Sequence, residues 1–325
     1  MTRSHHAHRY WLAALMALMF AGWAMAAPPS PAADAAMVQG KVVRLGKWFV
    51  GCDNLGSCSA ITPLGDPSIL EETPYLLMIF TRDIADAQTV AIMRGDAMID
   101  GFSPLAAHRL TEDLLNARRV GPVYLSDYPQ RYAVPREGFP AVMRALAQWR
   151  ATLPQHLRPA EAVTPVPAPR IDNPVVHPAL ANSAERCPSG HMGTSLQAWR
   201  GLGGSTLWRA GCGTEGLNSV SFWFVSGPQG NPPAPIRFED HGSPAQAFNS
   251  WFDEATGYLR MTHYFGRWDS LAEDCGIYRA YGWGFGEMKL AERRFMPDCG
   301  TGIGPEGWIT TYRSAVINNA PDSGP

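Results

Sequence analysis

The amino-acid sequence predicts an α+β protein, predominantly β, built as two antiparallel-sheet domains that a proline-rich linker joins. Glycine (32 residues), proline (28) and aromatic side chains (10%) are abundant, whereas charged side chains make up only 17%. Such a composition is typical of turn-rich β proteins. A strongly amphipathic helical stretch ends near residue 153, and a proline-rich stretch without periodicity follows at residues 154–186. The first domain is therefore expected to pack a helix on its sheet.

The N-terminus, residues 1–26, has the pattern of a secretory signal peptide. Arg3 and Arg9 precede an uncharged apolar run that ends in the small-x-small cleavage motif Ala24-Met25-Ala26. A retained membrane anchor is the alternative, but the run has about 16 residues and a spanning helix needs roughly 20. No cysteine lies at the cleavage site and no twin arginine occurs. We therefore expect an exported protein of the Gram-negative periplasm, or a secreted one, with residues 27–40 as a disordered lead-in.

The charge balance bears on the class of partner. Removal of Arg3 and Arg9 lowers the count of Lys and Arg from 27 to 25 against 29 Asp and Glu, so the exported chain carries about −4. A mildly acidic chain favours neither nucleic acid nor an anionic membrane surface as partner. We expect no membrane span after cleavage, and roughly 300 residues suffice for two domains that each bury a core.

Cysteine usage agrees with export. All six cysteines lie beyond the signal peptide, and an even number in an oxidising compartment predicts disulfides. Six cysteines allow 15 pairings. Proximity along the chain and the domain division favour three pairs: Cys52–Cys58, Cys187–Cys212 and Cys275–Cys299. A metal site is the alternative, yet no C-x-x-C motif occurs and the pair Cys187 and His191 has no second half. We therefore expect no metal and no cofactor.

The first domain, residues 41–153, is expected to hold a sheet and two helices. Strands are expected at residues 41–50, 57–62, 75–81, 88–93, 97–99 and 123–126, and a helix at residues 110–119. A second helix is expected to begin at Gly138. Its apolar residues recur at spacings of three and four, as on a helix that covers one face of a sheet: Phe139, Val142, Met143, Leu146, Trp149 and Leu153.

The second domain, residues 187–318, is expected to be an antiparallel β domain. The prolines of residues 154–186 predict an extended linker or a wrapping connection before it, because proline suits neither a central strand nor a helix interior. Strands are expected at residues 205–211, 219–226, 236–239, 248–253, 258–265, 275–281, 285–294 and 308–316. Residues 319–325 are expected to form a disordered tail.

Catalytic signatures are missing from the sequence. It contains no G-x-S-x-G, H-E-x-x-H, Walker A or EF-hand motif. The weak catalytic candidates are Asp240, His241 and His263, which could form an acid-base group, although no nucleophile is linked to them by spacing. Asp274 and its neighbour Glu273 could bind a cation, but hard cations need six to eight oxygens, and solvated turn acids explain the pair as well.

Aromatic residues of the second domain are too many for the inward face of one small sheet. Some of them should therefore be exposed, and an aromatic surface patch would suit a protein partner or a polysaccharide. The candidates for such a binding surface are Trp223, Trp251, Trp268 and Trp283. The alternative is that these rings form the core and cross-strand pairs of the sheet.

Several segments, in order along the chain, together resemble a known family. They are Trp48-Phe-Val-Gly-Cys-Asp-Asn-Leu-Gly-Ser-Cys58, the Gly138-Phe139 helix opening, Phe252-Asp-Glu-Ala-Thr-Gly257, Asp274-Cys-Gly276, and Cys299 followed by Trp308-Ile-Thr-Thr-Tyr-Arg313. The set resembles the exported proteobacterial family called domain of unknown function 1176, and the first half is more distantly similar to invasion-associated locus B proteins. The resemblance implies an exported α+β protein and supplies no catalytic residue or cofactor. Cys187 and Cys212 have no counterpart in the pattern.

Three functions compete on this sequence. The leading hypothesis is a non-enzymatic periplasmic protein that binds another envelope component, in its most specific form an inhibitor or immunity protein against a cell-wall hydrolase. It depends on the lack of convergent catalytic groups beside an excess of aromatic residues. The alternatives are an envelope glycan hydrolase that uses Asp240, His241 or His263, and a structural or stress-related envelope protein.

Overall fold

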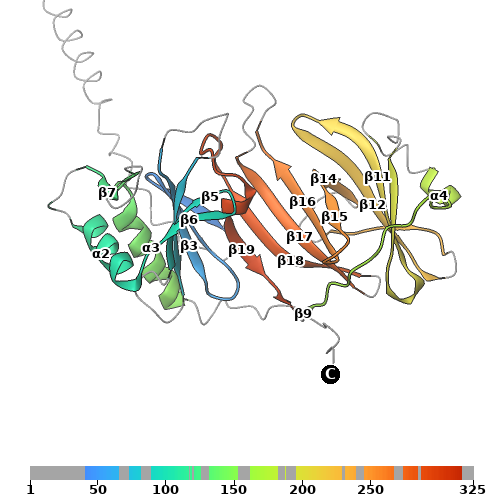
Figure 1. Cartoon of the computed structure of the whole chain (residues 1–325), viewed down its shortest axis with the longest axis horizontal. Coiled ribbons are helices and arrows are strands. Elements are labelled where there is room, and N and C mark those ends of the chain that lie inside the picture. The colour runs from blue at the N-terminus through green and yellow to red at the C-terminus, as the bar shows by residue number, and fades with distance from the viewer. Residues whose placement is uncertain are drawn as a thin grey trace, which may run out of the picture. The chain divides into compact units, whose positions relative to one another are not determined.

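The structure, a computed structural model, confirms the predicted class: it is mostly β, with several antiparallel sheets and few helices (Figure 1). It describes residues 41–65, 73–81, 89–116, 118, 121–125, 132–152, 162–181, 187, 195–228, 231–238, 245–266, 274–284 and 287–316. The predicted signal peptide, lead-in and tail lie outside the described residues. Among the residues described, no helix is long and apolar enough to cross a membrane.

The first sheet is a six-stranded antiparallel meander with its strands in chain order. The strands are β1 (Val42–Leu45), β2 (Trp48–Cys52), β3 (Cys58–Pro63), β4 (Tyr75–Phe80), β5 (Thr89–Arg94) and β6 (Ala97–Gly101). Every residue of β2 is buried, because alternate side chains enter two different cores. Trp48 and Val50 face the helices, whereas Phe49 points to the opposite side, where strand β19 lies (Figure 1).

Two helices, α2 (Pro104–Leu115) and α3 (Phe139–Thr152), cover one face of this sheet together with the hairpin of β7 (Val123–Leu125) and β8 (Tyr132–Val134). The predicted stripe of α3 is confirmed: Phe139, Val142, Leu146 and Trp149 are buried around Trp48. Leu153 lies outside the described residues.

Helix α2 begins six residues before the predicted start at residue 110 and ends at Leu115. The start is fixed by Ser103, whose side chain accepts a hydrogen bond from the Ala106 N–H at 3.3 Å, and by Pro104 in the first turn. A serine cap and a proline at the first helical position are both helix-start signals. The predicted helix at residues 110–119 is therefore wrong at both ends.

The second half contains two five-stranded antiparallel sheets that share a core. The first holds β10 (Leu196–Arg200), β11 (Thr206–Glu215), β12 (Asn218–Ser226), β13 (Ala234–Pro235) and β14 (Gln246–Phe248). The second, called sheet E below, holds β15 (Trp251–Asp253), β16 (Tyr258–Tyr264), β17 (Gly276–Gly284), β18 (Glu287–Met296) and β19 (Ile309–Arg313). Trp199 and Trp223 from the one sheet pack with Phe252, Tyr281 and Trp283 from the other.

The single strand predicted at residues 248–253 is wrong, because the chain passes there from one sheet to the other. Asn249 has a positive φ of 41°, which breaks the extended backbone. Its side-chain oxygen accepts hydrogen bonds from the Ser219 N–H and hydroxyl at 2.8 and 3.1 Å, and its amide donates to Asn218 and to the Thr262 carbonyl. These bonds tie β12 to β16 at the corner.

The proline-rich stretch is described from residue 162 to residue 181 and packs against the second half. Its β9 (Ala162–Val163) pairs in parallel with β20 (Ala315–Val316). Farther along, Ala168 donates its N–H to the Glu254 carbonyl at 3.0 Å, and α4 (Pro178–Ala181) ends this part. The stretch thus runs along the two sheets of the second half.

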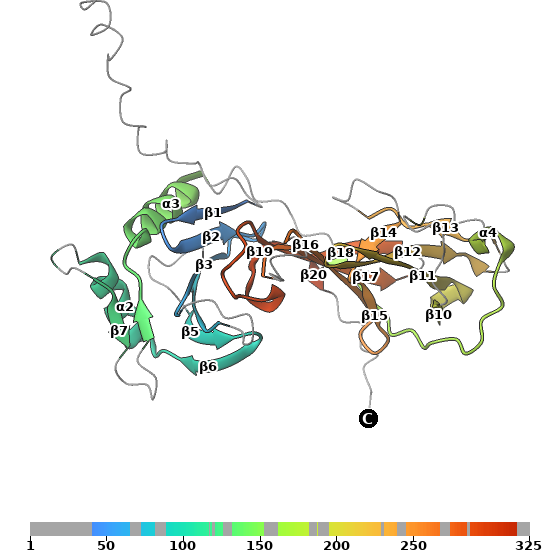
Figure 2. The same ribbon diagram turned by 90° about the horizontal axis from the view of Figure 1, so that it is seen from above.

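Strand β19 of sheet E lies beside the first sheet (Figure 2), and an apolar core joins the two sheets. Phe49, Ile61 and Tyr75 of the first sheet pack there with Trp308 and Ile309 of the second half. The loop before β19 carries the 3-10 turn η5 (Pro305–Gly307). The predicted halves of the chain therefore meet in a shared apolar core.

The structure contains the three predicted disulfides, Cys52–Cys58, Cys187–Cys212 and Cys275–Cys299. The loops at two of them form hydrogen bonds between the two halves. In the Cys52–Cys58 loop, the Asn54 side chain exchanges two hydrogen bonds of 2.9 and 2.7 Å with the backbone of Arg313, as a neighbouring strand would. In the loop after Cys299, the Gly302 carbonyl accepts the Thr73 N–H at 2.9 Å.

Candidate functional site

The structure separates the tryptophans that were candidates for a binding surface. Trp223 and Trp283 are buried in the core between the two sheets of the second half, so neither contributes to a surface. Trp251 is 47% exposed on the edge strand β15. Trp268 lies outside the described residues. The expectation of an exposed aromatic residue therefore holds for Trp251.

Of the catalytic candidates, only His263 is described; Asp240 and His241 lie outside the described residues. His263 shares the core-facing side of β16 with Leu259 and Met261, and its ring stacks on Phe248 with centroids 4.2 Å apart. Burial lowers the pKa of His263, and the positive charge of Arg279 lowers it further, against a smaller opposite effect of Glu215. The side chain is thus a neutral, stacked imidazole at neutral pH.

This partly buried histidine makes the stability depend on pH. Because the pKa of His263 is lowered from 6.5 in the folded state, the unfolded chain takes up a proton first as the pH falls below 6.5. His263→Phe keeps an aromatic ring on Phe248. We expect it to flatten the rise of the unfolding free energy with pH on the acid side of about pH 6.5, by less than one proton per molecule. Urea denaturation at a series of pH values measures the slope, and an unchanged slope would contradict the assignment.

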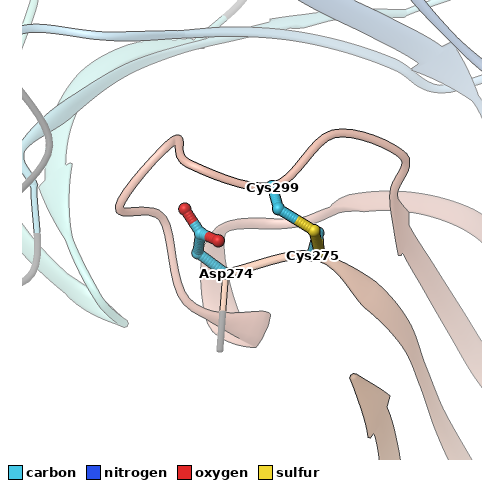
Figure 3. A group of neighbouring side chains, drawn as sticks. All are labelled: Asp274, Cys275 and Cys299. Carbon is cyan, nitrogen blue, oxygen red and sulfur yellow. A yellow bond between two sulfur atoms is a disulfide. The ribbon is translucent and has the colours of Figure 1, made fainter. Parts of the chain in front are cut away.

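A group of possible metal ligands lies at the Cys275–Cys299 disulfide (Figure 3). Ligand atoms of Asp274, Cys275 and Cys299 lie within 4.8 Å of one another, but the two sulfurs are bonded to each other and are not thiolates. The Asp274 carboxylate accepts hydrogen bonds from the Gly300 and Gly302 N–H groups and from the Thr301 hydroxyl. These bonds assign Asp274 to closing the loop. Glu273 lies outside the described residues.

The site that emerges instead is one face of sheet E, here called the Arg–Tyr face. Its members are Trp251, Asp253, Tyr258, Arg260, Tyr278, Glu292 and Arg294. They share a face because the register places Trp251 opposite Arg260, and Tyr278 opposite Arg294. The small residue Ala280 lies between Arg260 and Glu292 in the register and leaves room for the long side chains around it.

The charges of the Arg–Tyr face are paired. Arg294 donates from Nε and Nη2 to the two carboxylate oxygens of Glu292 at 2.9 and 3.0 Å, and its guanidinium lies 5.0 Å from the Tyr278 ring centroid. Arg260 lies 3.5 Å from Asp253 and 6.0 Å from the Tyr258 ring. Two arginine–aromatic–carboxylate groups thus stand side by side on a rigid sheet.

The protonation states of four of these groups are fixed near neutral pH. A hydrogen bond from the Thr256 side chain, with further bonds from backbone N–H groups and the charge of Arg260, lowers the pKa of Asp253 despite its partial burial. Burial raises the pKa of both Tyr258 and Tyr278. Burial alone would lower the pKa of Arg294, but its hydrogen bonds and ion pair with Glu292, together with the effects of Tyr278 and Glu306, outweigh burial and raise it.

A cavity of about 150 Å³ adjoins the Arg–Tyr face where sheet E meets the first sheet. Glu292 and Arg294 line it from sheet E, and Ile61 and Leu77 line it from the first sheet. The Arg294 Nη1 group also donates to the carbonyl of Glu306 at 3.1 Å, which holds the η5 turn at the cavity wall. The face therefore continues into the space between the two halves.

This arrangement suits binding better than proton transfer. A glycosidase-type acid needs a carboxyl whose pKa is raised, whereas Asp253 has a lowered pKa and stays ionised. The two phenols stay protonated and can donate and accept hydrogen bonds. The described part of the face offers pre-oriented charges, phenols and one exposed indole.

Tyr258 and Tyr278 belong to the abundant aromatic residues of the second domain, whereas the two arginines of this face were not among the candidate site residues. The signal was present in the spacing, because Tyr258 and Arg260, like Glu292 and Arg294, are two residues apart and so lie on the same face of a strand. The cross-strand register that brings the two pairs together is not visible in the sequence.

No family model matches the sequence, and no curated protein and no solved structure matches it either.

Proposed function

We propose that the protein is a non-enzymatic binding module of the periplasm that binds a protein component of the cell envelope through its Arg–Tyr face. The observation that carries the proposal is the composition of this face. Tryptophan, tyrosine and arginine are the residues in which binding hot spots are enriched, and here Trp251, two tyrosines and two arginines share one face of sheet E.

Preorganisation supports the same function. The arginines are held by Asp253 and Glu292, so a partner would not have to order them on binding. The two phenols keep their hydrogen-bonding groups at a partly open surface. An inhibitor or immunity protein against a cell-wall hydrolase is the most specific form of this proposal, since such proteins need a rigid, stable recognition surface.

The proposed compartment rests on the sequence and on the cysteines. The N-terminal pattern of a signal peptide and three disulfides both fit an oxidising compartment. The proposal of a periplasmic family, domain of unknown function 1176, rests on the ordered motifs that carry that resemblance.

The test uses Trp251→Ala, with Leu202→Ala as the matched control. The two side chains are 47% and 46% exposed, but Leu202 lies in the 3-10 turn η3 (Leu202–Gly204) and does not belong to the Arg–Tyr face. Protein with intact disulfides captures partners from an envelope extract of the producing bacterium, and calorimetry then measures Kd for the purified partner. We expect Trp251→Ala to weaken binding about thirtyfold and Leu202→Ala to leave it unchanged.

Two results would count against the proposal. Equal Kd values for the two variants would exclude the Arg–Tyr face as the interface. Failure to retain any envelope protein on the disulfide-bonded chain would favour the structural or stress-related alternative. The glycan hydrolase alternative requires Asp240 or His241 beside His263 within hydrogen-bonding reach.

A further inference from the structure

A second surface lies on the first half of the chain, at the end of strand β6. A cavity of about 400 Å³ is lined there by residues of β6, α2 and strand β7. We call it the α2–β7 groove. It is lined by Asp100, Phe102, Leu105, Leu110, Asp113 and Tyr124. Its volume is in the range of pockets that bind ligands or peptide side chains.

Apolar side chains are concentrated around this groove. Of the eleven large apolar side chains exposed among the described residues, five lie on β6, α2 and β7: Met98, Ile99, Leu105, Leu115 and Tyr124. Leu105 and Tyr124 belong to the groove itself and are 59% and 50% exposed. Exposed apolar side chains gathered at a concave site are typical of an interaction surface.

The backbone around the groove favours an extended occupant. Within the part of the chain that the structure describes, β6 pairs only with β5 and β7 pairs only with β8. Among the described residues each strand therefore has one edge without a strand partner, and an extended segment can pair with such an edge. The backbone N–H of Gly101 in β6 already donates a hydrogen bond to Asp100 Oδ1 at 2.7 Å, so it is not available to an added strand. The side chains of the bound segment should therefore contribute more to binding than its backbone hydrogen bonds to β6.

The charges of the groove select a basic occupant. Asp100 and Asp113 are half-buried in its walls, whereas Arg109, the basic side chain of the lining, is exposed. Half-buried carboxylates interact more strongly with an incoming cation than exposed groups do, because water screens them less. Acidic walls beside Leu105 and Tyr124 complement a segment that alternates basic and apolar residues.

We propose that the α2–β7 groove binds an extended segment of a partner protein, with an apolar side chain between Leu105 and Tyr124 and a lysine or arginine at Asp100 and Asp113. This site is separate from the Arg–Tyr face, since it is built from β6, α2 and β7 of the first half. A partner could therefore engage the chain at two places, which raises the overall affinity.

The probe is a capped peptide of alternating lysine and leucine, about seven residues long, which spans β6 in extended form. Its counterpart replaces each lysine by glutamate. Calorimetry with the full, disulfide-bonded protein at low salt measures the two Kd values. We expect the lysine peptide to bind at least tenfold more tightly, and hydrogen exchange to slow at β6 and β7.

Variants separate specific contacts from a general charge effect. Asp100→Asn with Asp113→Asn removes both carboxylates, while an asparagine at position 100 can still accept the Gly101 N–H. We expect this pair to weaken binding of the lysine peptide at least tenfold. Asp96→Asn, in the tight turn between β5 and β6 and outside the groove, is the control for the change in net charge and should leave Kd unchanged. Leu105→Ala should also weaken binding.

Three outcomes would overturn the proposal: equal affinity for the two peptides, equal effects of Asp96→Asn and the groove variants, or occupation of the groove by a second copy of the chain. Sedimentation of the protein alone detects the last of these. Trp251→Ala should not change the affinity for the lysine peptide, so this proposal and the one for the Arg–Tyr face can fail separately.

Discussion

Replacing Cys275 and Cys299 together by alanine is expected to lower the free energy of unfolding by about 3 kcal/mol, because the disulfide closes a loop of 24 residues in the unfolded chain. The loss of the disulfide should also weaken local hydrogen bonds in the folded protein. The bond anchors the loop in which Asp274 accepts hydrogen bonds from Gly300 and Gly302, and Gly302 in turn accepts the Thr73 N–H of the first half. Denaturation and hydrogen exchange at Thr73 measure the two effects.

The Cys187–Cys212 disulfide provides a matched control. Its sequence separation is 25, so the alanine pair Cys187→Ala and Cys212→Ala should lose a similar amount of loop-closure stability. It lies in a core of the second half, with Trp208 and Phe222. Exchange at Thr73 should therefore accelerate only in the variant that lacks Cys275 and Cys299. Equal acceleration in both variants would contradict a local role for the Cys275–Cys299 loop.

Periodic features of the fold could be predicted from the sequence because they depend on local spacing. The apolar stripe of α3 follows the helical period, and its residues enter the core as predicted. The disulfide pairs follow from proximity along the chain. Two of the errors have local causes of another kind: Ser103 starts α2 through a cap, and Asn249 ends β14 through a positive φ. The strand predicted at residues 236–239 is also wrong, because β13 (Ala234–Pro235) ends before it.

The Arg–Tyr face could be predicted only in part. The spacing of Tyr258 and Arg260 places them on one face of a strand, but the apposition with Tyr278 and Arg294 depends on the register of β16, β17 and β18. The register includes a bulge in β18 that no periodicity announces. Aromatic content alone did not distinguish the buried Trp283 from the exposed Trp251.

Gly138→Ala is expected to lower the free energy of unfolding by about 3–4 kcal/mol, since it combines backbone strain with a steric overlap. Gly138 precedes α3 with a positive φ of 89°, and an added Cβ would overlap the carbonyl oxygen of Leu45 in β1. The helix start approaches the β1–β2 turn this closely at Gly46 as well, where an added Cβ would lie 2.8 Å from the Glu137 carbonyl oxygen. Urea denaturation measures the loss.

Comparison with Gly121→Ala isolates the steric part of this loss. Gly121 has a similar φ of 93°, but an added Cβ there meets no atom of the described residues within 4 Å, so only the conformational strain of about 1–2 kcal/mol remains. The excess loss in Gly138→Ala then reports how closely α3 must approach the sheet for Phe139 to reach Trp48. If the two variants lose equal stability, the helix can move away from β1 at little cost, and the Gly138-Phe139 motif is a matter of turn conformation rather than of close packing.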